Sequence, residues 1–515
     1  MTNDQLLIGL DVGTTNIKGI VFTPRGEMVA SASRPTRTHY LGTEIADFFP
    51  EEFWEDIQAI LRELVSRCPS PKRIVALSFA SFGEAGVAVD KGGSPLAPIM
   101  AWFDQRSWEV MEAWRRQVDE YEVFRITGMR INHVSSLAKI LWERQHRPDA
   151  YREAKKWLFM ASYLIHKLTG DYCTDYSIAS RSMLFDIHTK TWSERMCQLA
   201  GIPVDLLPPA FPSGTPVGEI RSDVAGDLGL KGKVTVVLGG HDHPCGALSV
   251  GLRKKGEVVN STGTGDVLCA LIDPARVDQR YFEAGVNCGC HVAGGHTYML
   301  AGTHAAGKLV DWFLENFSAE SELPGEQRYE CIATRAASAP IGSHGVVVFP
   351  HLRGSRTPHN DPLSKGAILG LRTTHTGCDI ARAIFEGLSM EVRTLLDAFT
   401  ELTGDTYPEI RCFGGGSRNR FWVQMKADVL SRRMRINTIQ ENAALGAALL
   451  AGIGSGLYRD ADEAFQHLSL DEETFVPDPA STQVYRQMYD TFYRNLYPRL
   501  APINHDIETV LKLLP

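Results

Sequence analysis

The residue with the clearest capacity for chemistry is Asp242, a lone carboxylate that follows a short β-branched run at residues 234–238. The run meets Gly239 and Gly240, and Pro244 with small residues after it favours the start of a helix. The pattern predicts a strand that breaks at the two glycines and places Asp242 at its carboxyl end, where open α/β sheets bind ligands. This carboxylate could accept a proton, although capping of the following helix would explain it equally well.

A second set of polar residues follows an apolar run near the start of the chain: Asp11, Gly13, Thr14, Thr15 and Lys18. Glycine lets the backbone approach a ligand, the hydroxyls and backbone N–H groups can donate to it, and lysine adds positive charge. Together they suit a phosphate chain. The lone carboxylate could hold Mg²⁺ through its waters, since that ion takes few carboxylates. A plain hairpin with a polar turn would contain the same residue types.

The same pattern returns half a chain later, where residues 257–272 are expected to form strand, Thr/Gly turn and strand. Gly263 and Thr264 lie in that turn. One such loop is a weak signal, but a matched pair predicts an internal duplication whose two halves face a shared cleft.

Polar and aromatic residues also follow two predicted strands between these loops. Glu84 comes after the strand at residues 73–79, and Trp102, Asp104 and Arg106 follow an apolar stretch. Carboxylates pair with hydroxyls and an indole face packs against C–H groups, so this set suits a polyhydroxylated ligand. A surface ion pair between Asp104 and Arg106, and a core role for Trp102, are equally consistent with the pattern.

Three glycines at 414–416 separate a predicted strand, 409–413, from a predicted helix. Such a turn lets a flat ring or a phosphate lie against the backbone at a helix N-terminus, although it is also common without any ligand. Residues 107–200 are expected to be mostly helical. The small-residue segment 442–451 is expected to form a helix suited to close packing.

Composition sets limits on the class of protein. The 515 residues exceed one core and predict two or more domains, and the net charge of −8 gives no reason to expect nucleic acid or an anionic membrane as partner. No secretion signal and no apolar run of about 18 residues is present, which predicts a cytoplasmic protein. The ten scattered cysteines indicate reduced thiols, and Cys288-Gly-Cys290-His291 is expected to be a structural strand rather than a metal site.

With both loops, Asp242 and the triple-glycine turn, the sequence resembles the FGGY family of carbohydrate kinases over nearly its whole length. The family's C-terminal signature is matched by residues 366–371 and 379–386, and its N-terminal signature only in part by 136–142, since Val134 and Glu143 are unusual there. The resemblance implies an α/β fold of two duplicated ribonuclease H-like domains, as in actin, hexokinase and Hsp70 ATPases. The implied domains are 1–246 and 247–515, around an interdomain cleft.

The resemblance also implies roles for single residues. Asp242 would be the catalytic base and contact the substrate, with Asp11 serving Mg²⁺. The remaining implied residues fall into four groups: Gly13, Thr14, Thr15 and Lys18 for the first phosphate site; Gly263 and Thr264 for the second; Gly307, Asp311, Gly415, Gly416 and Asn419 for the rest of the nucleotide; and Glu84, Trp102, Asp104 and His243 for the substrate.

The implied activity is transfer of the γ-phosphate of MgATP to a primary hydroxyl of a small sugar, by a homodimer without nucleic-acid or membrane partners. A ketopentose such as xylulose or ribulose is the expected substrate. Xylulokinase-like members usually have Gln-Met-His where this chain has residues 81–84, and Asn where it has His243. A polyol, a deoxy-hexulose or an aldonate therefore remains an alternative, as does a non-catalytic ATP-binding sugar sensor on the same fold.

Overall fold

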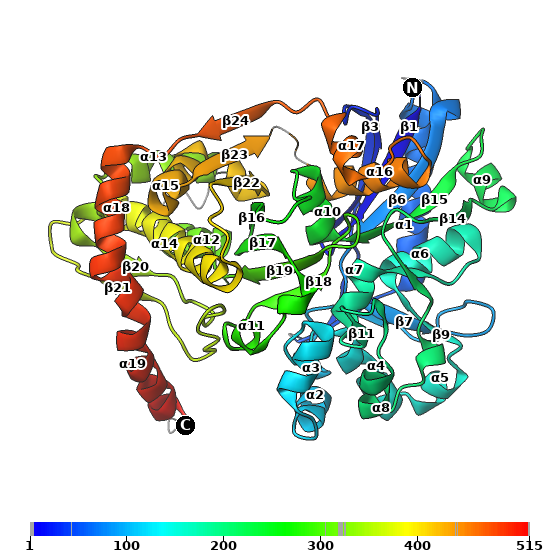
Figure 1. Ribbon diagram of the computed structural model, residues 1–515, viewed down its shortest axis with the longest axis horizontal. Helices are drawn as coiled ribbons and strands as arrows, with labels where there is room; N and C mark the ends of the chain where they lie inside the picture. The colour runs from blue at the N-terminus through cyan, green and yellow to red at the C-terminus, as the bar shows by residue number, and fades with distance from the viewer. Residues whose placement is uncertain are drawn as a thin grey trace.

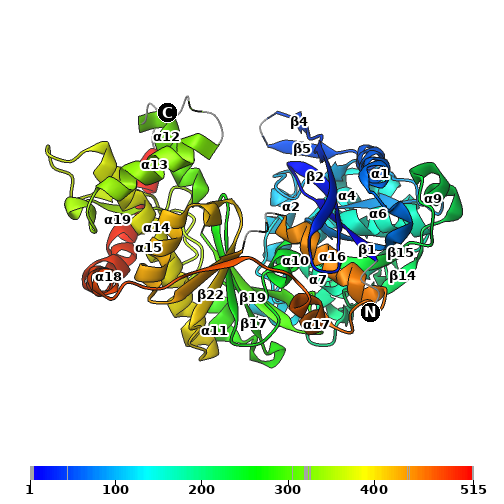
Figure 2. The ribbon, with the colours of Figure 1, turned by 90° about the horizontal axis from the view of Figure 1, so that it is seen from above.

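Two mixed sheets form the centres of two layered α/β bodies in the computed structural model, which lie side by side in Figures 1 and 2. The structure describes residues 5–512 apart from 43, 304, 318–322, 324–325, 438 and 440. The first sheet has the order β14-β15-β6-β1-β2-β3. In chain order its strands are β1 (Leu6–Val12), β2 (Asn16–Phe22), β3 (Met28–Pro35), β6 (Ile74–Ser81), β14 (Pro216–Glu219) and β15 (Thr235–His241).

The second sheet has the order β18-β19-β17-β16-β22-β23-β24. Its strands are β16 (Val258–Thr262), β17 (Asp266–Ile272), β18 (Asn287–Cys290), β19 (Thr297–Gly302), β22 (Glu409–Phe413), β23 (Arg433–Asn437) and β24 (Glu472–Phe475). In the first sheet β1 is antiparallel to β2 and parallel to β6, which is parallel to β15. In the second, β16 is antiparallel to β17 and parallel to β22, which is parallel to β23. This repeated connectivity confirms the predicted duplicated α/β fold.

Helices cover both faces of the first sheet. On one face α1 (Pro50–Arg67) and α6 (Met160–Thr169) pack against the strands, and on the other lies α16 (Asn442–Gly454), far away in sequence. The small residues of α16 allow its backbone to touch β1, because a Cβ on Gly9 would lie 1.8 Å from the Ala444 carbonyl oxygen. The orange α16 and α17 (Ala461–Gln466) therefore lie beside the blue strands in Figure 2. The predicted packing helix is confirmed.

α10 (Asp242–Ser249) lies between the two sheets. It packs against α16, where a Cβ on Gly446 would lie 2.0 Å from the Cys245 carbonyl oxygen, and its end joins the cluster of apolar side chains on the second sheet. The other face of that sheet packs against α14 (Gly377–Thr403), which is flanked by α12 (Gly307–Phe317), α13 (Glu326–Ser338) and α15 (Arg420–Leu430). Two helices, α18 (Pro479–Thr491) and α19 (Leu496–Leu511), complete the chain.

A mostly helical region follows β6, as predicted. It contains α2 (Trp108–Arg115), α3 (Glu120–Thr127), α4 (Ser136–His146), α5 (Pro148–Glu153), α7 (Tyr176–Ala179), α8 (Glu194–Ala200) and α9 (Ser222–Leu228). Short strands pair outside the large sheets: β4 (His39–Leu41), β5 (Ile45–Phe48), β7 (Gly86–Val89), β8 (Ile99–Met100), β9 (Lys156–Phe159), β10 (Thr174–Asp175), β11 (Phe185–Asp186), β12 (Thr191–Trp192), β13 (Ala210–Phe211), β20 (Val347–Phe349) and β21 (Ala367–Leu369).

One sequence prediction about this scaffold was wrong. The strand before Asp242 does not break at Gly239 and Gly240 but continues to His241. The glycines are needed for close packing instead, since a Cβ on Gly239 would lie 1.9 Å from the Phe79 carbonyl oxygen. The register with β6 shifts between Val237 and Gly240, which marks a bulge. Asp242 is consequently the first residue of a helix.

The predicted strand at Cys288 and Cys290 is confirmed as part of β18, and all ten cysteines are free thiols in the structure. Among the described residues, no group of His, Cys, Asp or Glu side chains has the arrangement of a metal site. No helix in the described part of the chain combines the length and apolar character needed to cross a bilayer.

Candidate active site

The carboxyl ends of three neighbouring strands bring the predicted acidic residues together. β1, β6 and β15 are parallel, and the register aligns Val12 with Ser81 and Ser81 with His241. Asp11 precedes the end of β1, Glu84 follows β6, and Asp242 follows β15. Three carboxylates from distant parts of the sequence therefore meet at one edge of the first sheet, where ligands bind in open α/β sheets.

Asp242 is held from the strand that precedes it. The His241 backbone N–H donates to Ser177 Oγ over 2.8 Å, and the Ser177 backbone N–H donates to the buried Asp175 over 2.8 Å. The side chain of Asp242 is 33% exposed, so a ligand can reach it. A fixed backbone with an accessible carboxylate is the arrangement that a general base requires.

His241 is the immediate neighbour of this carboxylate. Its Nε2 lies 3.2 Å from Asp242 Oδ1, and the residue is only 6% exposed. Burial lowers the pKa of His241 to about 4, against the opposing pull of the Asp242 and Glu84 charges. The imidazole is therefore neutral near pH 7 and can donate one N–H to the carboxylate.

Asp11 lies opposite Lys18 in the β1–β2 hairpin. Burial, then repulsion from Asp242 and Glu441, raises the pKa of Asp11 to about 7, although Lys18 acts in the other direction. Lys18 itself lies 2.8 Å from Glu441. A bound cation stabilises the ionised form of a carboxylate that lies near other negative charges, so Asp11 fits the predicted Mg²⁺ role.

The remaining residues of the first loop leave room for a ligand. Gly13 donates its N–H to the Asn16 carbonyl oxygen over 3.1 Å, and a Cβ at Gly13 would lie 2.9 Å from that oxygen. Thr14 is partly exposed and Thr15 is exposed. The loop is a tight hairpin whose threonines face solvent, as a phosphate site requires.

Glu84 is not an isolated carboxylate. Arg181, in the short 3₁₀ helix Ser180–Ser182, donates from Nε over 2.8 Å and from Nη2, both to Glu84 Oε1. Burial alone would raise the pKa of Glu84, but the Arg181 charge and hydrogen bonds lower it to about 2. Gly83 packs between His241 and Arg181, since a Cβ at Gly83 would lie 2.8 Å from His241 Cδ2 and 2.9 Å from Arg181 Cγ.

Sequence reasoning missed Arg181. Nothing in the local sequence distinguishes it from other arginines of the helical region. The only available signal was that a buried Glu84 would need a cation.

The other predicted substrate residues differ in accessibility. Trp102 is 37% exposed, with its ring edge-to-face against Phe103 at 5.4 Å. Asp104 is 1% exposed and receives hydrogen bonds from the Ala46 backbone N–H at 2.7 Å and from Arg106 at 2.7–3.0 Å. A sugar hydroxyl would have to displace these donors, so substrate binding by Asp104 stays a prediction. His243 is partly buried, 5.6 Å from the His241 ring.

The second Thr/Gly loop abuts the start of α12. Gly263 and Thr264 are exposed, and nothing lies within 4 Å of a Cβ placed on Gly263. The Gly307 N–H donates to the Gly263 carbonyl oxygen over 3.0 Å, so the two predicted nucleotide positions are adjacent. Asp311 accepts hydrogen bonds from Tyr329 and Arg328, which engage its carboxylate within the protein.

The triple-glycine turn packs against the same region. Gly414 has φ +88°, and a Cβ there would lie 2.6 Å from the Thr262 carbonyl oxygen. Gly415 is exposed with open space around it, and one 3₁₀ turn, Gly415–Arg418, precedes α15. Asn419 caps α15 by accepting the Trp422 N–H over 3.1 Å. The exposed glycine is available to a ligand, while Asn419 serves the helix.

A buried lysine beneath these loops was not predicted. Lys426 on α15 is 2% exposed and donates to Asp266 Oδ1 and Thr262 Oγ1 at 2.7 Å and to Asn260 Oδ1 at 2.9 Å. The ammonium also lies 4.4 Å from the centre of the Trp422 ring. It ties the β16–β17 hairpin to the helix that follows the triple-glycine turn.

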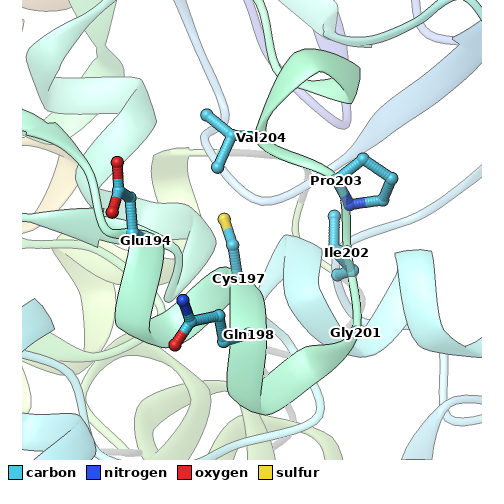
Figure 3. Close-up of a pocket in the computed structure, with 7 residues that line it drawn as sticks. All are labelled: Glu194, Cys197, Gln198, Gly201, Ile202, Pro203 and Val204. Carbon is cyan, nitrogen blue, oxygen red and sulfur yellow. The ribbon is translucent and has the colours of Figure 1, made fainter.

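A separate surface depression at α8 contains none of these residues. Figure 3 shows Cys197 and Glu194 on the helix facing Pro203 and Val204 on the segment that follows. Burial raises the pKa of Cys197 to about 11, so its thiol is protonated near neutral pH. The depression offers no carboxylate pair or cation cluster to compare with the edge at Asp242.

Comparison with known proteins matches both halves of this arrangement. Residues 6–249 match the N-terminal domain, and residues 258–455 the C-terminal domain, of the FGGY family of carbohydrate kinases. A xylulose kinase of Bacillus subtilis (strain 168) is 28% identical over 509 residues, 99% of this chain and 100% of the relative. A gluconokinase of the same strain is 27% identical over 521 residues, 98% of this chain and 99% of the relative.

A solved structure shows the same architecture. Xylulose kinase from Rhodospirillum rubrum, 27% identical, superposes with a TM-score of 0.86 over 97% of this chain and 100% of that one. The two-domain α/β fold predicted from the sequence, shared with actin and hexokinase, is thereby confirmed. The matched family consists of sugar phosphotransferases, and its kinase activity implies use of ATP. The chain belongs to the FGGY family of carbohydrate kinases.

Proposed function

We propose that this kinase transfers the γ-phosphate of MgATP to a primary hydroxyl of an uncharged ketopentose such as xylulose or ribulose, with Asp242 as general base. The observation that carries the proposal is the accessible Asp242 carboxylate, held at a strand end beside Asp11 and Glu84. Three carboxylates at one edge provide separate groups for proton removal, cation binding and recognition of hydroxyls.

Asp242 acts on the sugar. One of its oxygens, Oδ1, lies near the His241 Nε2 and accepts the His243 backbone N–H over 2.6 Å. The other oxygen, Oδ2, is directed to a sugar hydroxyl and takes its proton as the oxygen attacks phosphorus. Glu84 accepts a second hydroxyl through Oε2, because both Arg181 hydrogen bonds go to Oε1. The exposed indole of Trp102 packs on the C–H face of the sugar.

The two Thr/Gly loops hold the nucleotide in this proposal. Mg²⁺ neutralises phosphate charge when bound, with Asp11 as its acidic partner. Backbone N–H groups of residues 14–15 and 264–265 donate to the phosphates, because those of Gly13 and Gly263 are used within their hairpins, and exposed Gly415 contacts the adenosine. Closure of the two bodies around these groups excludes water, so that ATP is not hydrolysed without sugar.

The choice of substrate class follows from charge. A gluconokinase is among the relatives, and an aldonate would bring a carboxylate into the site. Arg181, which lines the site, is already paired with Glu84, which favours an uncharged sugar over an aldonate. Polyols and deoxy-hexuloses remain compatible with this pocket chemistry.

Measuring sugar-dependent ADP release over pentuloses, hexuloses, aldonates and polyols tests the proposal. We expect the largest kcat/KM for a ketopentose and little ADP release without sugar. ATPase activity that is indifferent to every sugar would favour the ATP-binding sensor instead. A larger kcat/KM for gluconate than for xylulose and ribulose would contradict the charge argument.

Two further expectations, on oligomeric state and on cellular location, belong to the same proposal. We expect a homodimer, which the family resemblance suggests, and a cytoplasmic location. Light scattering on the purified chain at several concentrations tests the first, and a mass of one chain at every concentration would contradict it. Fractionation of cells that produce the protein tests the second.

A further inference from the structure

The imidazole of His241 occupies a fixed position against Asp242. Its backbone N–H donates to Ser177 Oγ over 2.8 Å. Its ring packs against Gly83, where an added Cβ would lie only 2.8 Å from the ring Cδ2. The residue is 6% exposed, so water does not surround it. The ring therefore has little freedom to turn away from the carboxylate that follows it in the sequence.

The surroundings of the two ring nitrogens favour one tautomer. Nε2 lies 3.2 Å from Asp242 Oδ1, whereas Nδ1 is buried without a hydrogen-bond partner in the described structure. A neutral imidazole carries one N–H, and the carboxylate favours that proton on Nε2. Burial keeps the ring neutral by lowering the pKa of His241 to about 4. His241 is thus a neutral group in contact with Asp242 and does not compete with it as a base.

We propose that His241 is a positioning residue that fixes the rotation of the Asp242 carboxylate for proton removal from the sugar. This inference rests on the proposed role of Asp242. His241 Nε2 lies 3.2 Å from Oδ1, and the His243 backbone N–H donates to the same oxygen over 2.6 Å. Oδ2 is then the oxygen presented to the substrate, in one orientation rather than many. Pre-orientation of a base increases turnover without changing how tightly ATP binds.

The same ring connects the base to the substrate-recognition pair. Gly83 packs between His241 and Arg181, and the charges of Glu84 and Arg181 both act on the imidazole. Movement of the Glu84–Arg181 pair would therefore displace the ring that orients Asp242. This contact gives a route by which a correctly bound sugar aligns the base.

The test compares two replacements of similar size in the full-length enzyme. His241→Gln retains an amide N–H near the position of Nε2, and His241→Met fills the space without a donor. We expect His241→Met to lower kcat by about 10- to 100-fold with KM for ATP unchanged. His241→Gln is expected to retain kcat within about fivefold. Thermal unfolding checks that both variants are folded, and a kcat of His241→Met within twofold of wild type would overturn the proposal.

A double-mutant cycle separates positioning from a structural role. In an Asp242→Asn background, His241→Met is expected to cause less than a twofold further loss in the single-turnover rate, because the carboxylate to be positioned is gone. An equal fold-loss in both backgrounds would refute the proposal for His241. Near-normal turnover of Asp242→Asn alone would instead refute the proposed function, so the two failures are distinguishable.

Discussion

The two Thr/Gly hairpins occupy equivalent places in their sheets but differ in the charges behind them. Residues 13–15 join β1 to β2, and residues 263–265 join β16 to β17. Behind the first loop, burial and then repulsion from Asp242 and Glu441 raise the pKa of Asp11 to about 7, although Lys18 lowers it in part. Behind the second, the buried carboxylate of Asp266 is paired with Lys426 at 2.7 Å.

This difference in charge indicates a different task for each hairpin. An uncompensated carboxylate beside the loop creates a need for a cation and provides the acidic surroundings of the base. A neutralised carboxylate beneath the loop contributes rigidity but no reactive charge. In our proposal, the first half of the duplicated scaffold therefore contributes the reacting groups and one phosphate loop, while the second half holds the rest of the nucleotide.

Among changes at the two hairpins, removing the charge of Asp11 is expected to have the largest effect on catalysis. Asp11→Asn should lower kcat/KM by about 10²-fold, because the loop loses its acidic partner for Mg²⁺. The same change should stabilise the protein free of Mg²⁺ and nucleotide at neutral pH. Because the pKa of Asp11 is raised, the free energy of unfolding of wild type falls as pH rises from 3.8 to about 7. Over this range Asp11 ionises in the unfolded chain, whereas burial and Asp242 keep it protonated in the folded protein.

The advantage of Asp11→Asn in melting temperature should therefore grow over that pH range and level off above it. Thermal unfolding at half-unit pH steps, with EDTA present, measures it. An advantage that shrinks with rising pH would contradict the crowding of carboxylates at the first loop.

Removing Lys426, the cation behind the second loop, should lower the stability of the protein. Lys426→Met leaves Asp266 buried and unpaired, which is expected to lower the free energy of unfolding by about 3–5 kcal/mol. The matched change behind the first loop, Lys18→Met, breaks a partly exposed pair and should cost less than about 1 kcal/mol. Urea unfolding of both variants checks the contrast, with Lys426→Met/Asp266→Asn expected to recover part of the loss. Equal effects at the two lysines would remove the distinction between the loops.

The positions of the two hairpins, but not the charges behind them, could be predicted from the sequence. The repeated hairpins, the acidic residue after β15 and the glycine turn after β22 are local patterns, and local patterns determine strands and turns. Charge partners from distant segments could not be predicted. Arg181 reaches Glu84 across 97 positions and Lys426 reaches Asp266 across 160, and only the folded chain brings them together.

The packing of α16 on the first sheet could not be predicted either, because it too joins segments that are far apart in the sequence. Its small residues predicted a closely packed helix without indicating the sheet that would receive it. Its contact with β1 depends on Gly9, whose neighbour in space is Ala444. The predicted boundary between residues 246 and 247 stays a prediction, because a segment after it covers the sheet that precedes it.

Smaller effects should distinguish glycines that meet a ligand from glycines that meet the protein. Gly263→Ala has open space for its Cβ, so stability should change by less than about 0.5 kcal/mol while KM for ATP rises about tenfold as the methyl meets phosphate. Gly307→Ala would place its Cβ 2.8 Å from the Gly263 carbonyl oxygen and should lower stability as well. An unchanged KM for ATP in Gly263→Ala would place the nucleotide elsewhere.

The central claim is that one carboxylate, Asp242, removes the sugar proton while both loops hold the nucleotide. Rapid-quench single-turnover transfer from ATP to the preferred sugar, in wild type and Asp242→Asn, tests it most directly. We expect a rate lower by about 10²- to 10⁴-fold in Asp242→Asn, with unchanged ATP affinity and a melting temperature no lower than that of wild type. A folded Asp242→Asn enzyme that transfers phosphate at nearly the wild-type rate would contradict it.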